Sequence, residues 1–411
     1  MKVYPLDYII DHARKNSPFY KKLYEALGEN PKLEELPLVK LEDFWAAAAK
    51  GEVNTGEHTD GQVFKSGGTT GEPKYSLYTA AEWKTMCEAT GFYMPFGGLK
   101  HGDRVVNLFY GGNLYASFLY TYSIFNSSPA SVLQFGLGGF AEISDIVETL
   151  VKHRINLIAG LPSMIMKIME YIEGKGIAAD LQIDAIYFAG ETLFEEQRGK
   201  IRALLGENIE FRSMSYASND AGIMAYFHKD CGFNEHRVCD AVCILELLDP
   251  ETGEVIREQD RIGQIHITSL YKLLQPIIRY PSGDMGKYTE PEGSPDRKFM
   301  LLGRNAESAR IGVATIHPQN VSEALDSLNA KYDGFQMIIS RENLRDSIIF
   351  RIAGREVAGF VDKICEIQPL LNDCVTKGLV STPKVEFCAL SDLEYNKRTG
   401  KLMRIIDKRF A

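Results

Sequence analysis

Short apolar runs alternate with longer amphipathic stretches between residues 104 and 214, and this alternation restricts the fold more than any other feature of the chain. The apolar runs predict strands at 104–109, 131–135, 155–160, 185–190 and 209–214. The stretches with helical spacing predict helices at 143–153, 163–174 and 195–206. Strands that alternate with helices form parallel sheets, because each parallel connection is long enough to hold a helix. We therefore expect an α/β fold with a largely parallel sheet buried on both faces.

The pattern changes after about residue 222, where helical signals become sparse. Segments 243–256 and 264–270, separated by turn signals, predict antiparallel strands of a β-rich subdomain. Beyond Arg304 a small α+β unit is predicted, with helices near 318–330 and 356–367 and strands near 335–340 and 347–353. We therefore expect a large multi-layer body over residues 1–303 and a small C-terminal lid domain over residues 304–411.

Composition and charge exclude several classes of protein. The chain has 411 residues, of which 45% are hydrophobic, and a length of this order allows a large buried core. Its net charge of −9 argues against a nucleic-acid partner, because phosphate binding needs a clustered basic surface. No apolar run reaches the ~18 residues of a membrane helix, and Asp7 and Asp11 interrupt the apolar region that a signal peptide would need. We expect a cytoplasmic protein without a membrane partner.

The seven cysteines are odd in number and widely scattered, which argues against a disulfide framework. One stretch nevertheless gathers residue types that zinc prefers as ligands: His228, Cys231, His236 and Cys239. The close CxxC pairs of a structural zinc site are absent. Two interpretations stay open here, a zinc site and a set of buried or surface residues without a metal.

The strongest local signal lies between Lys65 and Lys74, in the run KSGGTTGEPK. Its three glycines allow successive backbone N–H groups to face one anion, and the hydroxyls of Ser66, Thr69 and Thr70 add further donors. Lys74 supplies a positive charge. The spacing does not fit GxxxxGK[ST], so this is not a Walker loop. The run indicates a polyphosphate cradle, with a flexible polar hairpin as the alternative.

This loop resembles the phosphate loop of the adenylate-forming acyl and aryl ligases, SSGTTGxPK. Further segments match the family in the same order along the chain: Ala189-Gly190-Glu191, Tyr216-Ala217-Ser218-Asn219-Asp220, Arg279-Tyr280-Pro281-Ser282-Gly283-Asp284, Gly303-Arg304 and Thr399-Gly400-Lys401. Within the superfamily the chain is most similar to phenylacetate–CoA ligases and their short relatives. That likeness rests on the compact length, the opening HARKNSPFYKKLYEAL, and the turn LLDPETGEVI followed by GQIHIT.

The resemblance implies that ATP and Mg²⁺ bind to these segments. The β- and γ-phosphates would lie on the loop residues Ser66, Gly67, Gly68, Thr69, Thr70 and Gly71, with Lys74. The adenine ring would stack on Tyr216, beside Ala189, Gly190, Glu191, Ala217, Ser218 and Asn219. Asp284 would accept the ribose hydroxyls, and Arg304 would donate to the ribose or the α-phosphate.

Two residues have implied catalytic roles beside Lys74. Asp220 stands where the family has glutamate and would hold Mg²⁺ through a carboxylate oxygen. Lys401, on a mobile lid, would stabilise the charge that develops when a carboxylate attacks ATP. The acyl pocket is expected by position to include Tyr110, Asn113, Gly136, Leu137 and Ser215, with small residues near 136 leaving room for a flat ring. A loop without ligand contact is the alternative for this last set.

The reaction implied by the resemblance has two steps. A carboxylic acid, aromatic or otherwise hydrophobic, is activated by ATP to an acyl-adenylate with release of pyrophosphate, and the acyl group then passes to the thiol of CoA. Ala306, where the family has aspartate, and Val313, beside Gly312, depart from the pattern in the half of the chain that concerns the second step. A carrier-protein thiol or an amine therefore stays open as acceptor, as does a non-catalytic nucleotide-binding protein. A homodimer is implied by the relatives.

Overall fold

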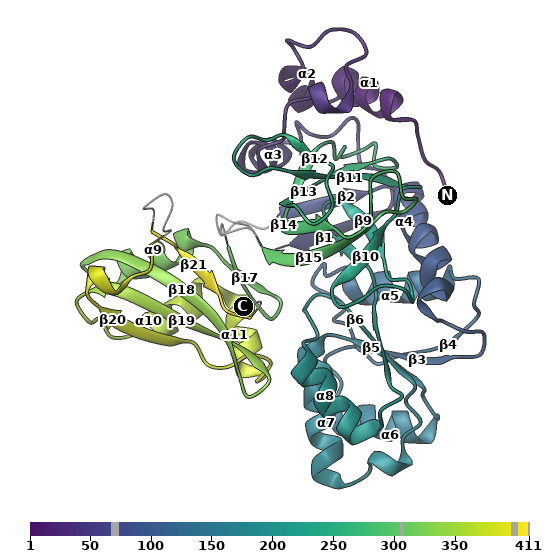
Figure 1. The fold of residues 1–411 in the computed structure, drawn as a ribbon, viewed down its shortest axis with the longest axis vertical. Helices are drawn as coiled ribbons and strands as arrows, with labels where there is room; N and C mark the ends of the chain where they lie inside the picture. Colours follow the sequence, from purple (N-terminus) through teal and green to yellow (C-terminus); the bar gives the residue numbers. More distant parts are fainter. Residues whose placement is uncertain (67–73, 305–307, 396–401, 410–411) are drawn as a thin grey trace.

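The computed structural model describes residues 1–66, 74–304, 308–395 and 402–409, and for Arg304 only the backbone. A long body contains the residues up to 304, and a smaller unit, here called the lid, contains the described residues from 308 onward (Figure 1). None of the helices in these described ranges combines the length and the apolar character needed to cross a membrane.

One half of the body is a five-stranded parallel sheet with the strand order β4-β3-β5-β6-β7. Its strands are β3 (Arg104–Asn107), β4 (Leu133–Gly136), β5 (Leu157–Gly160), β6 (Ala185–Phe188) and β7 (Glu210–Ser213). Its connections contain α5 (Ser117–Asn126), α6 (Ile143–Lys152), α7 (Pro162–Lys175), η3 (Ala178–Asp180) and α8 (Glu195–Leu205). Every residue of β5 and β6 is buried, which explains why the central strands read as continuous apolar runs. The predicted parallel sheet is confirmed.

The other half is an eight-stranded antiparallel sheet with the order β12-β11-β13-β14-β15-β10-β9-β8. Its strands are β8 (Tyr216–Ser218), β9 (Gly222–Tyr226), β10 (Glu235–Val238), β11 (Cys243–Leu248), β12 (Val255–Ile256), β13 (Ile262–Ser269), β14 (Tyr280–Tyr288) and β15 (Lys298–Arg304). The β-rich subdomain is thus present and is larger than the two antiparallel segments predicted from the sequence. The mixed α/β class expected for the chain is confirmed.

An N-terminal helical layer lies over one end of the antiparallel sheet (Figure 1). It consists of α1 (Leu6–Asn16), α2 (Pro18–Leu23), η1 (Leu33–Glu35) and α3 (Leu41–Ala48). Arg279, which directly precedes β14, holds this layer against the sheet. Its guanidinium forms a buried ion pair with Glu246 at 3.0 Å and donates to the carbonyl oxygens of Glu34 and Leu36. The layer is therefore part of the body's core.

A hairpin of β1 (Gln62–Ser66) and β2 (Lys74–Tyr78) precedes α4 (Ala80–Tyr93) and η2 (Met94–Gly97). Helix α4 begins with a capping box: the Thr79 hydroxyl accepts from the Glu82 N–H, and the Glu82 carboxylate accepts from the Thr79 N–H. Glu82 is buried, and this fixes the join between β2 and the helix.

The lid has its own core around a four-stranded sheet with the order β20-β19-β18-β21. Its elements are β16 (Ala309–Ile311), β17 (Ala314–Ile316), α9 (Pro318–Ser327), β18 (Tyr332–Glu342), β19 (Arg345–Gly354), α10 (Phe360–Ile367), α11 (Pro369–Thr376), β20 (Lys384–Cys388), η4 (Leu390–Asp392) and β21 (Ile405–Asp407). The two predicted strands form one long hairpin, and both predicted helices are present. The sequence did not indicate α11, β20 or β21.

Candidate functional site

The predicted phosphate loop connects the two strands of a hairpin. Ser66 and Lys74 are cross-strand partners in β1 and β2, so the two ends of the loop are neighbours. The ammonium of Lys74 lies 5.4 Å from the ring centroid of Trp45 in α3. Gly67, Gly68, Thr69, Thr70 and Gly71 lie outside the described residues, and the role of the loop stays a prediction.

The Asp220 carboxylate joins segments that are far apart in the sequence. Its Oδ1 accepts a hydrogen bond from the Ser76 hydroxyl at 2.8 Å, and its Oδ2 accepts one from the Tyr280 hydroxyl at 3.0 Å. The Trp45 indole N–H in turn donates to the Tyr280 oxygen at 3.0 Å. A carboxylate has about four acceptor positions. Among the described residues these two hydroxyls use one on each oxygen, which is compatible with an additional cation.

Tyr216 and Asp284, which the sequence places beside adenine and ribose, are in direct contact. The Tyr216 hydroxyl donates to Asp284 Oδ2 at 2.7 Å. The Tyr216 ring is largely buried and packs edge-on against Phe299, with 5.8 Å between centroids. Asp284 is the backbone partner of Arg304 in the neighbouring strand β15. The Tyr216, Asp284 and Gly303-Arg304 segments therefore meet in space. Ala217 and Ser218, which follow Tyr216, are exposed, and Asn219 is half-buried.

Glu191 follows β6 and lies at the N-terminus of α7. Its carboxylate accepts hydrogen bonds from the backbone N–H and the hydroxyl of Ser163, both at 2.9 Å, as expected for an anion at a helix N-terminus. Burial, together with the negative charge of Asp346 in the lid, raises the pKa of Glu191 to about 7. Gly190 before it has φ +82°, a conformation that glycine adopts readily. Ala189 is half-buried at the end of β6.

The residues predicted for the acyl pocket are distributed over three sets of contacts. Gly136 and Leu137 follow β4, where a methyl group built on Gly136 would lie 3.0 Å from the Phe118 ring. The Phe118 ring therefore lies against this loop, and the acyl-pocket role of Gly136 and Leu137 stays a prediction. Tyr110 packs edge-on against Phe140 at 4.8 Å, beside this loop.

The other two pocket residues lie elsewhere. Ser215 is hydrogen-bonded to the Tyr120 hydroxyl at 3.2 Å. Asn113 is exposed and accepts from the Lys65 ammonium at 3.0 Å, so it faces the β1–β2 hairpin.

Comparison with known proteins finds relatives along nearly the whole chain. No family model matches. A phenylacetate-coenzyme A ligase of Pseudomonas putida is 22% identical, with 99% of this chain and 93% of that protein aligned. The corresponding protein of Thermus thermophilus is 23% identical, with 89% and 84% aligned.

Among solved structures, 2-hydroxyisobutyryl-CoA ligase in complex with 2-HIB-AMP and CoA aligns with a TM-score of 0.77, covering 98% of this chain and 88% of that chain at 18% identity. The amide bond synthetase McbA from Marinactinospora thermotolerans aligns with a TM-score of 0.57, covering 83% and 67% at 13% identity. The chain has the fold of the adenylate-forming ligases. The predicted resemblance to this superfamily, and to phenylacetate–CoA ligases within it, is confirmed.

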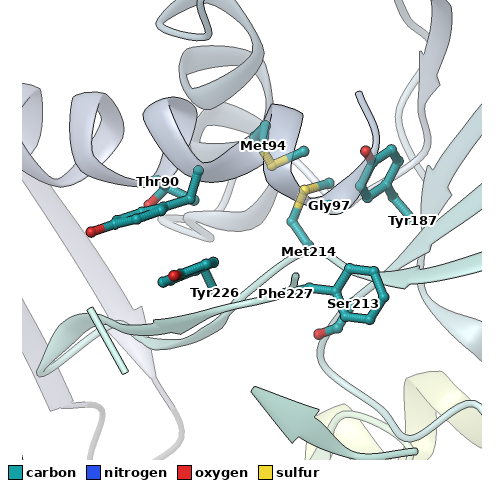
Figure 2. Close-up of a pocket in the computed structure, with 9 residues that line it drawn as sticks. Thr90, Met94, Gly97, Tyr187, Ser213, Met214, Tyr226 and Phe227 are labelled. Atoms are coloured by element: carbon teal, nitrogen blue, oxygen red, sulfur yellow. The ribbon is translucent and has the colours of Figure 1, made fainter. Parts of the chain in front are cut away.

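On this ligase fold, a small cavity is lined by residues of α4, η2, β7 and β9 (Figure 2). Its volume is about 10 Å³, close to the lower limit for one water molecule. The side chains of Met94, Met214 and Tyr226 converge on it, and Tyr226 stacks on Tyr93 with 3.8 Å between centroids. This cavity is too small to hold an organic acid.

The zinc hypothesis is wrong for the described residues, which contain no group of three or more His, Cys, Asp or Glu side chains placed to hold a metal. His236 points inward and is hydrogen-bonded through Nε2 to Ser213, while burial lowers its pKa to about 4. His228 lies near the surface and contacts Asp230 at 2.6 Å. Cys239 is buried, and burial raises the pKa of its thiol. Cys231 likewise has a pKa raised by burial, to about 11. Closeness in sequence failed here because only His236 lies in strand β10, whereas His228 and Cys231 belong to the irregular segment before it and Cys239 follows it.

The lid of this ligase fold contacts helices α7 and α8 of the body. Arg345 pairs with Glu170 at 2.9 Å, and Gln197 donates to the carbonyl oxygen of Leu344 at 3.0 Å. Val313, in the turn between β16 and β17, packs against the cores of both body and lid. Ala306 and Lys401 lie outside the described residues.

Sequence reasoning missed Ser76, Tyr280 and Trp45. Ser76 follows Lys74 by two positions on a strand and so shares its face, which is a usable signal. Tyr280 lies inside the motif that contains Asp284. No signal in the sequence pointed to Trp45.

Proposed function

We propose that this protein is an AMP-forming acid–thiol ligase that activates a carboxylic acid with ATP and transfers the acyl group to CoA. The observation that carries the proposal is the convergence on Asp220. This carboxylate is hydrogen-bonded both to the strand that leaves the predicted phosphate loop, through Ser76, and to the motif that contains Asp284, through Tyr280. Segments that match the ligase family only in sequence order therefore meet in space. The curated relatives are named phenylacetate-coenzyme A ligases, and the proposed activity is of that class.

The described residues fit Mg-ATP. Asp220 would hold Mg²⁺ through an oxygen, and the hydroxyls of Ser76 and Tyr280 keep that carboxylate oriented. The metal, when bound, would neutralise charge on the phosphates. Lys74 and Ser66, at the two ends of the loop, would contact the leaving pyrophosphate. Tyr216 and Asp284 would bind adenine and ribose, as their mutual hydrogen bond places them side by side.

In the proposed first step, a carboxylate oxygen of the acid attacks the α-phosphorus of ATP, and the bond to pyrophosphate breaks. Lys401 would stabilise the charge that develops between the two anions. In the second step the thiol sulfur of CoA attacks the acyl carbon, AMP leaves and the thiol proton passes to solvent. Rotation of the lid, residues 304–411, would withdraw Lys401 between the steps.

The acid is proposed to be aromatic or otherwise hydrophobic, and CoA is the proposed acceptor, with a carrier-protein thiol or an amine as alternatives.

The seven cysteines form no disulfide, which fits a reducing compartment such as the cytoplasm. A homodimer stays a prediction.

The test is an ATP–pyrophosphate exchange assay across a panel of carboxylic acids, followed by product analysis with and without CoA. Acid-dependent exchange that Lys74→Ala abolishes, together with acyl-CoA formation, would support the proposal. Exchange without acyl-CoA for any accepted acid would move the acceptor to a carrier protein or an amine. Binding of ATP without exchange for any acid would favour a non-catalytic nucleotide-binding protein.

A further inference from the structure

Lys272, in the connection between β13 and β14, is a fully buried cation that none of the roles above explains. Its exposed fraction is 0%. Its ammonium donates to the backbone carbonyl oxygen of Asp220 at 2.8 Å and lies 3.8 Å from the ring centroid of Tyr78. Lysine is almost never fully buried without a partner, because removing the charge from water is costly. The Asp220 carbonyl and the Tyr78 ring are therefore the partners that compensate this buried charge.

The backbone next to Lys272 is held rigidly. The buried carboxylate of Glu82 accepts hydrogen bonds from the N–H groups of Leu273 at 2.6 Å and Leu274 at 2.8 Å. Glu82 itself belongs to the capping box at the start of α4. The ammonium of Lys272 is thus attached to a fixed support.

Lys272 and Tyr78 together bond two consecutive backbone carbonyl groups. The Tyr78 hydroxyl donates to the Asn219 carbonyl oxygen at 2.7 Å, while Lys272 bonds the next carbonyl, that of Asp220. Tyr78 belongs to β2, the strand that begins at Lys74. The cation over its ring therefore links the strand that leaves the loop to the backbone of the Asp220 segment.

We propose that Lys272 is a positioning residue, which holds the Asn219–Asp220 backbone against β2 so that the Asp220 carboxylate keeps its distance from the loop ends at Ser66 and Lys74. The inference rests on the proposed function, since it gives Lys272 an effect on Mg-ATP through Asp220. Lys272 touches neither the nucleotide nor the acid in this role.

The test compares Lys272→Met, which keeps the chain length and removes the charge, with the matched control Arg212→Met. Arg212 is also a buried cation over a tyrosine ring, that of Tyr187 at 5.3 Å, and its guanidinium donates to Glu210 and Tyr187, which do not belong to the candidate site. Isothermal titration calorimetry would measure ATP affinity with saturating Mg²⁺ and with EDTA. We expect Lys272→Met to weaken Mg-ATP binding about tenfold or more and metal-free ATP binding much less, with no such difference for Arg212→Met.

Pyrophosphate exchange gives a second readout, in which KM for Mg-ATP should rise more than kcat falls. Circular dichroism would check folding, and Tyr78→Phe, which removes the bond to Asn219, should shift the same quantities in the same direction if Lys272→Met does not fold. The inference would be overturned if Lys272→Met lost equal ATP affinity with and without Mg²⁺. It would also be overturned if Lys272→Met and Tyr78→Phe both kept the wild-type affinity for Mg-ATP. A wild-type chain that binds no ATP would instead refute the proposed function.

Discussion

The hydroxyl of Tyr216 donates a hydrogen bond to the carboxylate of Asp284, with 2.7 Å between Oη and Oδ2. The two residues come from different strands of the antiparallel sheet, β8 and β14, which are not neighbours in it. Their contact orients the carboxylate that is proposed to bind ribose. It also fixes the ring that is proposed to stack on adenine, so each group limits the movement of the other.

Removal of the Tyr216 hydroxyl tests this arrangement. Tyr216→Phe keeps the stacking surface and is expected to raise KM for ATP by about three- to tenfold with little change in kcat, because one hydrogen bond contributes ~0.5–1.5 kcal/mol. Tyr226→Phe is the matched control, since the Tyr226 hydroxyl also donates to an aspartate, Asp296, at 2.9 Å. Equal effects of the two substitutions on KM would show that Tyr216 acts only in packing.

Asp220 is expected to be far less replaceable. Asp220→Asn keeps the shape and an acceptor for Ser76 or Tyr280 but removes the charge that would hold Mg²⁺. Adenylation should fall by about 10²-fold or more, a loss of ~2.7 kcal/mol or more, and the Mg²⁺ concentration at half-maximal rate should rise. Asp296→Asn serves as the control. An unchanged Mg²⁺ dependence in Asp220→Asn would exclude the metal-holding role.

Replacement of Lys401 is expected to separate the two half-reactions. Lys401→Ala should lower adenylation by about 10²-fold or more and leave acyl transfer from a chemically prepared adenylate nearly unchanged. Lys397→Ala, which removes a lysine four positions earlier, should affect neither step. If both half-reactions fell equally in Lys401→Ala, the two-position lid mechanism would not hold for this chain.

The raised pKa of Glu191 predicts that the stability of the fold depends on pH. Its pKa is raised to about 7 by burial and by Asp346, while Arg310 and the bonds from Ser163 act in the opposite direction. Because the folded pKa exceeds the unfolded value, this group stabilises the fold fully below about pH 4.5, and the stabilisation is lost as pH rises through about 7. Thermal unfolding of Glu191→Gln between pH 5 and 8 should lack this loss. Glu195→Gln, at an exposed position of α8, should behave like the wild type.

The contact between lid and body can be tested by charge exchange. Arg345→Glu places like charges opposite Glu170 and should slow the half-reaction that uses this lid position, while Arg345→Glu with Glu170→Arg should restore it. We expect acyl transfer to CoA to be the affected step, measured from a prepared adenylate. An equal effect on pyrophosphate exchange would show that the contact serves general stability. The absence of rescue in the double variant would show that the pair does not act through its charges.

The parallel sheet was predictable because its central strands are buried on both faces and therefore continuously apolar, as in 157–160 and 185–188. The antiparallel sheet was underestimated because strands such as β14, with the sequence YPSGDMGKY, contain proline and glycine and lack clear alternation. Motif order located Tyr216, Asp220 and Asp284. Their partners, among them Ser76 and Lys272, depend on contacts between distant segments, which no local pattern encodes.

The buried ion pair between Arg279 and Glu246 has a consequence for how a chain of this kind can be shortened or recombined. The same guanidinium closes off the carbonyl groups of Glu34 and Leu36, so deletion of the N-terminal layer would expose a charge pair that is now shielded. Each of the two hydrogen bonds that the guanidinium would lose contributes about 1.5–3 kcal/mol, a sizeable fraction of the stability of a typical domain. The first fifty residues should therefore be exchanged between chains only together with β11 and β14. A chimera that exchanges one without the other would place a foreign backbone against the Arg279 guanidinium, whichever acid its donor prefers.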